Sequence, residues 1–243
     1  MSIKRHIPNF LTLMNLLSGS LSVYFFSIGH LDWASYMIFI AAMFDFLDGF
    51  VARMLHVSSP LGVQLDSLAD VVSFGLAPSF LLMQLIMDSH GRRSFMLFSV
   101  DIVPFLALLI VLFAALRLAK FNIDDRQTTR FLGLPTPAAG LMIASLPLLK
   151  MQLYEGQSLF YMLVTNTYFY LATILILCVL MVSEFPLLGL KFKTFGWRMN
   201  ELRYIFLIAS AILLVWLYWI AIPFILLLYL FISMVAFLAD IQS

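Results

Sequence analysis

Four aspartates in one short stretch are the residues of this sequence best suited to chemistry. Asp45 and Asp48 are three residues apart, and Asp66 and Asp70 are four apart. On helices, such spacings place side chains on one face, so each pair presents two carboxylates together. The pairs are separated by ARMLHVSSPLG, whose serines, proline and glycine favour a turn between antiparallel helices. We therefore predict that the two pairs face each other across neighbouring helices.

A cluster of four carboxylates needs a compensating cation, because like charges repel and ionised side chains are costly near a bilayer interior. Ligands that are all oxygen favour Mg²⁺, Mn²⁺ or Ca²⁺ over zinc. Magnesium commonly shares its coordination shell with substrate phosphates, and two metal ions about 3.5–4 Å apart can clamp a phosphorus centre. The spacing thus indicates a site for divalent cations and a phosphorylated substrate.

Three residues after the first pair could serve the same ligand. Gly49 has no side chain, so a ligand could approach the helix backbone there, and Ala52 places only a methyl group on the same face. Arg53 adds a cation suited to phosphate. Taken singly, each has a plainer explanation in helix packing or in anchoring at the membrane surface. Their joint spacing favours the ligand.

The elements that must position these residues are membrane helices. Hydrophobic residues make up 63% of the 243 residues, charged residues make up 11%, and the mean hydropathy is +1.03, which excludes a soluble domain. The apolar runs do not alternate as barrel strands would, so they are expected to be helices. A net charge of +1 gives no case for nucleic-acid binding, and the single Cys178 excludes an intrachain disulfide.

The apolar runs predict an all-α, polytopic transmembrane helix bundle of about eight spans, forming one domain over residues 1–243. The last two spans are divided near Ile222 and Pro223, because proline interrupts a helix. A single tilted helix with a re-entrant piece is the alternative. The predicted spans are 8–28, 33–54, 64–87, 101–121, 136–153, 159–182, 202–220 and 222–240.

Basic residues in the loops predict the orientation in the inner (cell) membrane. With the N-terminus in the cytoplasm, more basic residues fall inside than outside, and the aspartates lie at the cytoplasmic face. The inside residues are Lys4, Arg5, Arg53, Lys120, Arg126, Arg130, Lys191, Lys193, Arg198 and Arg203, and the outside ones are Arg92, Arg93 and Lys150.

Written out, the acidic stretch is D-x₂-D-G-x₂-A-R-x₈-G-x₃-D-x₃-D, from Asp45 through Gly62 to Asp70. This pattern resembles the signature of the CDP-alcohol phosphotransferases, with all eight fixed positions present. Members of that family displace CMP from a CDP-linked lipid or alcohol with a hydroxyl acceptor, at a membrane site that holds two divalent cations. Intact signature positions argue against a catalytically silent scaffold.

The resemblance implies roles for the signature residues. Asp45, Asp48, Asp66 and Asp70 would hold two divalent cations, Mg²⁺ or Mn²⁺, and Asp70 would also be the general base for the acceptor hydroxyl. The CDP pocket would be lined by Asp48, Gly49, Ala52, Arg53 and Gly62. The fold implied is a six-helix core over about residues 7–182 with two additional C-terminal helices over about 202–240, in a protein expected to be a homodimer.

The flanking segments resemble one branch of that family. IPNFLTLMNLLSG, SLADVVSFGLAP, RLAKFN and FLGLPTPAAG, within residues 7–145, are similar to the CDP-diacylglycerol–serine O-phosphatidyltransferases. Beyond residue 145 the resemblance is only hydropathic. The motif resemblance over residues 7–145 implies transfer of the phosphatidyl group from CDP-diacylglycerol to L-serine, giving phosphatidylserine and CMP, by direct in-line attack of the serine hydroxyl.

Two further pairs have residue types that fit this site. Thr12 and Asn15 could face the nucleotide from the first span, or could make hydrogen bonds between helices. Arg117 and Lys120, three residues apart, could meet the serine carboxylate or a phosphate, or could extend to the interface as anchoring cations.

Two other functions remain open. One is the same transfer to another alcohol, such as glycerol 3-phosphate, an inositol phosphate or choline. The other is a divalent-cation transporter with the aspartates in its permeation path, although transport sites are usually near the membrane midplane and these aspartates lie toward one face.

Overall fold

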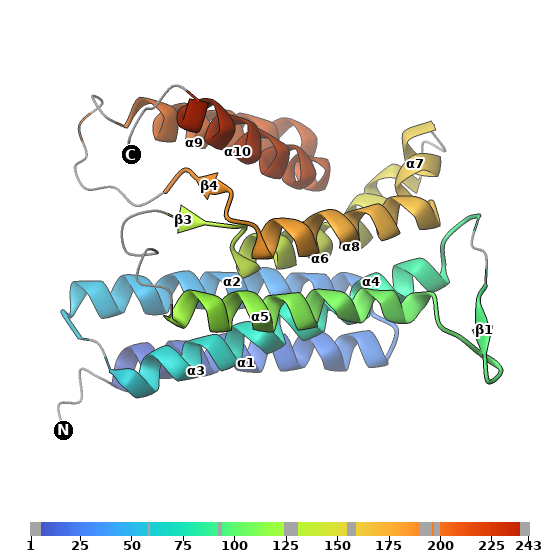
Figure 1. Cartoon of the computed structure of the whole chain (residues 1–243), viewed down its shortest axis with the longest axis horizontal. Helices are drawn as coiled ribbons and strands as arrows, with labels where there is room; N and C mark the ends of the chain where they lie inside the picture. The colour runs from blue at the N-terminus through green and yellow to red at the C-terminus, as the bar shows by residue number, and fades with distance from the viewer. Residues whose placement is uncertain are drawn as a thin grey trace.

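The computed structural model describes residues 6–57, 59–91, 94–123, 131–154, 159–189, 196 and 200–238. These residues form a bundle of helices with two short two-stranded ribbons (Figure 1), which confirms the predicted all-α class. Several of the basic residues behind the predicted orientation lie outside the described part of the chain, namely Lys4, Arg5, Arg92, Arg93, Arg126, Arg130, Lys191, Lys193 and Arg198.

The first two helices form an antiparallel hairpin. Helix α1 (His6–Ser27) and helix α2 (Leu31–Met54) are joined by a tight turn in which Gly29 has φ +84, a left-handed conformation that glycine adopts without steric cost. The hydroxyl of Ser22 donates to the carbonyl of Ala34 at 2.7 Å and ties the two helices together near this turn. The acidic end of α2 therefore lies beside the start of α1.

The third span is one long helix made of three parts. Helix α3 (Pro60–Asp70) continues through a π-helical turn, η2 (Val71–Leu76), into α4 (Ala77–Met87). The side chain of Ser59 caps α3 by accepting a hydrogen bond from the amide of Gly62 at 3.0 Å, and Pro60 occupies the first helical position. The helix thus begins at 60 rather than at the predicted residue 64, because its cap lies in the polar loop.

The middle of the chain adds five helical segments and the two ribbons. They are η3 (Pro104–Leu108), α5 (Leu109–Ile123), α6 (Thr136–Tyr154), α7 (Leu159–Val164) and α8 (Thr167–Val182). Strand β1 (Met96–Leu97) pairs with β2 (Val100–Asp101), and β3 (Phe131–Leu132) pairs with β4 (Pro186–Leu187). The prediction of one continuous helix over 159–182 is wrong, because Asn166 starts a new helix by accepting from the amide of Tyr168 at 2.9 Å.

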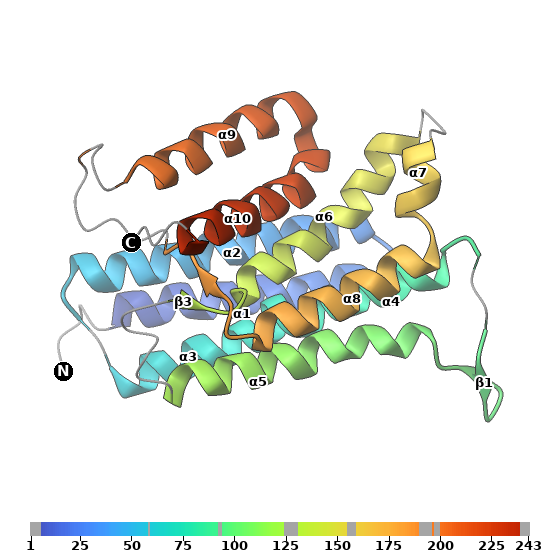
Figure 2. The ribbon, with the colours of Figure 1, turned by 45° about the horizontal axis from the view of Figure 1, so that its top comes forward.

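The chain ends in a second helical hairpin. Helix α9 (Glu201–Leu217) and helix α10 (Ala221–Leu238) pack side by side and antiparallel in both views (Figures 1 and 2). The bend is the short turn Tyr218–Ile220, where Tyr218 has φ +51. The chain therefore divides into two helices of similar length close to the predicted position, with Pro223 in the first turn of α10.

Within the described residues, five helical stretches are long and apolar enough to cross a membrane. They are His6–Ser27, Leu31–Met54, Pro60–Met87, Pro104–Ile123 and Glu201–Leu238, the last folded as the α9–α10 hairpin. Buried side chains such as Phe74, Leu82 and Ile143 form the interior, while many large apolar side chains are exposed on the outside of the bundle. The protein is a multi-pass membrane protein.

Candidate active site

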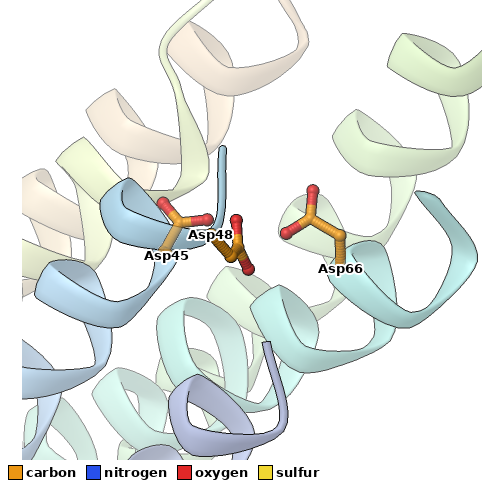
Figure 3. A group of neighbouring side chains, drawn as sticks. All are labelled: Asp45, Asp48 and Asp66. Carbon is orange, nitrogen blue, oxygen red and sulfur yellow. The ribbon is translucent and has the colours of Figure 1, made fainter. Parts of the chain in front are cut away.

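Three aspartates converge where α2 ends and α3 begins. Asp45 and Asp48 project from α2, and Asp66 projects from α3 toward them (Figure 3). Each residue offers a carboxylate oxygen, and these oxygens all lie within 4.8 Å of one another. The antiparallel arrangement of α2 and α3 is what brings these residues together.

Asp70 lies deeper, one turn further along α3. It is only 6% exposed, and the side-chain amide of Asn15 donates to its Oδ1 at 3.3 Å. The charges of Asp45 and Asp66 are close enough to act on it. Within the described residues, Asp70 does not belong to the group of mutually close carboxylates, so it borders that group from the protein interior.

The donor set fits a divalent cation. Oδ1 of Asp66 is buried and has no hydrogen-bond partner among the described residues, whereas Oδ2 of Asp48 accepts from the hydroxyl of Thr12 at 2.7 Å. A buried, unpartnered carboxylate oxygen beside two further carboxylates is unfavourable unless a cation balances the charge. Three carboxylates with only oxygen donors are suited to a hard cation such as Mg²⁺ or Mn²⁺. The acidic cluster can therefore bind a metal ion.

A cavity of about 170 Å³ adjoins the carboxylates between α1, α2 and α3. Five of the residues expected to bind the nucleotide line it: Thr12, Asp48, Gly49, Ala52 and Gly62. The remaining lining residues are Asp66 of the acidic cluster and five that the sequence reasoning did not assign to the pocket, namely Pro8, Asn9, Val57, Ser59 and Val63. Of these five, Asn9 could have been predicted from the sequence, because it lies three residues before Thr12 and residues so spaced share a helix face.

The two glycines of the cavity lie against other side chains. A Cβ on Gly49 would lie 3.2 Å from Nη1 of Arg53, and one on Gly62 would lie 3.0 Å from Oδ1 of Asn9. Arg53 itself is exposed and covers Gly49 rather than lining the cavity. Small residues at these positions therefore leave room for both the polar side chains and a ligand.

Asn15 does not line the nucleotide cavity but contacts Asp70. Besides its side-chain bond to Asp70, its backbone carbonyl accepts a hydrogen bond from the hydroxyl of Ser73 at 3.0 Å. Ser73 belongs to the π-helical turn that directly follows Asp70. Asn15 therefore joins α1 to both sides of Asp70, which is one form of the interhelical hydrogen bonding left open above.

The two cations of α5 have different environments. Arg117 is 8% exposed, donates through Nη1 to the hydroxyl of Thr136 at 3.1 Å, and is close enough to Asp70 for their charges to interact. Lys120 lies at the surface, where its Nζ is 3.4 Å from Oε1 of Glu184. Arg117 thus borders the acidic cluster, while Lys120 forms an ion pair with the chain segment after α8.

Comparison with known proteins places this geometry in a family. A family model described as CDP-alcohol phosphatidyltransferase matches residues 5–238, a range that includes the α9–α10 hairpin. The match therefore extends well beyond residue 145, where the resemblance of the sequence motifs ends.

Several curated relatives support the same grouping. A Helicobacter pylori protein named CDP-diacylglycerol–serine O-phosphatidyltransferase is 31% identical over 199 residues, which cover 79% of this chain and 75% of that protein. A Bacillus subtilis protein of the same name is 34% identical over 142 residues, 58% of this chain and 75% of its own length. The archaetidylserine synthase of Methanothermobacter thermautotrophicus is 36% identical over 144 residues, 57% of this chain and 56% of that protein. With its acidic cluster, its adjoining cavity and a family match over nearly its whole length, this chain belongs to the CDP-alcohol phosphatidyltransferase family.

Proposed function

We propose that this protein transfers the phosphatidyl group of CDP-diacylglycerol to L-serine, producing phosphatidylserine and CMP. The observation that carries the proposal is the position of Asp45, Asp48 and Asp66 at the edge of a cavity lined by the signature residues. The names of the relatives support serine as the acceptor. A transferase is favoured over a cation transporter, because the family is one of transferases.

Asp70 is the proposed general base. Asn15 holds its Oδ1, so the proton of the serine hydroxyl would pass to Oδ2. The serine oxygen then forms a bond to the β-phosphorus, the one that carries the diacylglycerol, and the bond from that phosphorus to the bridging oxygen breaks, so CMP leaves with the electron pair. Direct attack needs no covalent enzyme intermediate, and no Ser, His or Cys nucleophile enters the scheme.

Asp45, Asp48, Asp66 and Asp70 are the residues that would hold two divalent cations, Mg²⁺ or Mn²⁺. Bound there, the cations would neutralise the diphosphate and the charge that develops on phosphorus. The unpartnered Oδ1 of Asp66 supports this assignment. Thr12 orients Asp48 by its 2.7 Å hydrogen bond and so keeps one carboxylate of the cluster in a fixed position.

The substrates would bind on two sides of the acidic cluster. The cavity between α1, α2 and α3 would hold the CDP moiety, with Gly49, Ala52 and Gly62 admitting it and the exposed Arg53 near the diphosphate. On the other side, the buried guanidinium of Arg117 is suited to the carboxylate of serine. Lys120 has a partner in Glu184 and is not needed for this role.

An acceptor assay tests the function directly. Purified protein with CDP-diacylglycerol and either Mg²⁺ or Mn²⁺ is expected to release CMP when offered L-serine, and a chelator should abolish the release. Ethanolamine has the hydroxyl and the amine but lacks the carboxylate, so it should be a poor acceptor. Product with glycerol 3-phosphate, an inositol phosphate or choline but not with serine would overturn the serine assignment.

We also propose that the acidic cluster faces the cytoplasm. Among the basic residues in the described part of the chain, Arg53 is near the end of α2, Lys120 near the end of α5 and Arg203 near the start of α9. These helix ends lie at the end of the bundle that holds the cluster, whereas the end of α6, which carries Lys150, lies toward the other end (Figure 1). The start of α1 and the end of α10 share the first end. Alkaline phosphatase fused behind α10 should therefore be inactive in cells, and an active fusion would contradict this orientation. A homodimer stays a prediction of the family resemblance.

A further inference from the structure

The α9–α10 hairpin holds the backbone of the segment that follows β4. The hydroxyl of Tyr229 donates to the carbonyl of Leu188 at 3.0 Å, and the amide of Leu188 donates to the hydroxyl of Ser233 at 3.1 Å. Nε of Arg203 donates to the carbonyl of Gly189 at 2.7 Å. Tyr229 and Ser233 are both buried, so their bonds to Leu188 are shielded from competing water and lipid headgroups. The helix pair therefore fixes two consecutive residues of a loop.

That loop is joined to the segment in front of α6. Strand β4, directly before Leu188, pairs antiparallel with β3, and the amide of Gly133 donates to the carbonyl of Phe185 at 3.0 Å. Gly133 has φ +72, and a Cβ there would lie 2.8 Å from the carbonyl oxygens of Met181 and Ser183. This contact fixes the β3 segment against the end of α8, and the pairing of β3 with β4 together with the bond from Gly133 to Phe185 links a shift of β4 to β3.

The β3 segment leads directly to the active site. Thr136, the first residue of α6, is fully buried and accepts the hydrogen bond of Arg117. Thr136 therefore joins the β3 segment to Arg117 by a direct side-chain contact. A chain of contacts thus leads from α10 through Leu188, the β3–β4 ribbon and Thr136 to the guanidinium of Arg117.

We propose that Tyr229 and Ser233 are positioning residues for the acceptor side of the active site. By holding Leu188 they fix the β3–β4 ribbon, which keeps Thr136 and thus Arg117 directed toward the place of the acceptor carboxylate. The inference rests on the proposed function, in which Arg117 binds that carboxylate. It gives the C-terminal hairpin a role in acceptor binding and none in binding CDP-diacylglycerol, whose cavity lies between α1, α2 and α3.

The test compares Michaelis constants for the two substrates. In Tyr229→Phe combined with Ser233→Ala, both side-chain bonds to Leu188 are lost, so KM for the acceptor alcohol should rise about tenfold. KM for CDP-diacylglycerol should stay within about twofold of wild type, because its cavity is untouched. KM does not depend on the fraction of protein that is folded, so partial misfolding would not imitate this split.

Ser210→Ala is the matched control. Ser210 is a buried serine of α9 whose hydroxyl has no hydrogen-bond partner among the described residues, so this variant should leave both constants unchanged. An unchanged acceptor KM in the double variant, or an equal rise for both substrates, would overturn the inference. The assay uses whichever alcohol the wild type accepts, so failure of serine as the acceptor would be seen separately, in the wild type alone.

Discussion

Asp70→Asn is expected to lower the rate of phosphatidyl transfer about a thousandfold, because the amide cannot take the proton of the acceptor hydroxyl. The substitution preserves the shape of the side chain and can keep the hydrogen bond from Asn15 to Oδ1. Asp45, Asp48 and Asp66 remain in place, so the protein should still bind CMP in the presence of Mg²⁺. The rate is measured as CMP release at saturating serine, and binding as the rise in thermal stability with CMP and Mg²⁺.

Asp32→Asn provides the comparison for that variant. Asp32 lies in the first turn of α2, at the opposite end of the same helix from the acidic cluster, so its loss should leave the rate unchanged. If Asp70→Asn retained more than about a tenth of the wild-type rate, Asp70 would not be the general base. If it also lost the response to CMP and Mg²⁺, Asp70 would be needed mainly as a metal ligand.

Gly19→Ala is expected to damage both stability and activity from a position outside the cavity. A Cβ on Gly19 would clash with Oγ of Ser73 and lie 2.7 Å from its Cα, so α1 and the π-helical turn must move apart. Such overpacking typically costs about 1–3 kcal/mol of stability. The same movement stretches the bond from Ser73 to Asn15, the residue that holds Asp70, and a misplacement of about 1 Å can cost about a hundredfold in rate.

Thermal unfolding in detergent and CMP release measure these two effects. Gly189→Ala is the control, since no atom of the described residues lies within 4 Å of the Cβ it would add. It should unfold at the wild-type temperature and keep the wild-type rate. A Gly19→Ala protein with wild-type activity would show that the spacing of α1 and the π-helical turn does not control the position of Asp70.

The sequence predicts the part of the site that depends on spacing along helices. The intervals between Asp45, Asp48 and Asp66, with a turn between the helices, are enough to anticipate that their carboxylates meet. The position of Asn15 was not predictable in this way, because it depends on how closely α1 approaches the π-helical turn. That approach is possible only because position 19 has no side chain.

Other differences have a similar origin in long-range packing. Lys120 is paired with Glu184, 64 residues away, in a loop whose sequence has no pattern that would reveal the contact. The break between α7 and α8 has no proline or glycine, and three polar residues, Thr165, Asn166 and Thr167, stand there between two apolar runs, with the side chain of Asn166 capping the new helix. Hydropathy thus predicts where helices lie, but pairing between distant segments decides which polar groups meet.

The π-helical turn after Asp70 rotates α4 about the helix axis relative to α3. One extra residue in a helix offsets everything beyond it by about 100°. The acidic face of α3 and the closely packed face of α4, with Leu81 and Leu85 in the interior, can therefore change independently over evolutionary time. A homologue that lacked one residue of this turn would keep its hydropathy profile and its eight signature residues. If α4 kept its packing in such a homologue, Asp66 and Asp70 could no longer face α2.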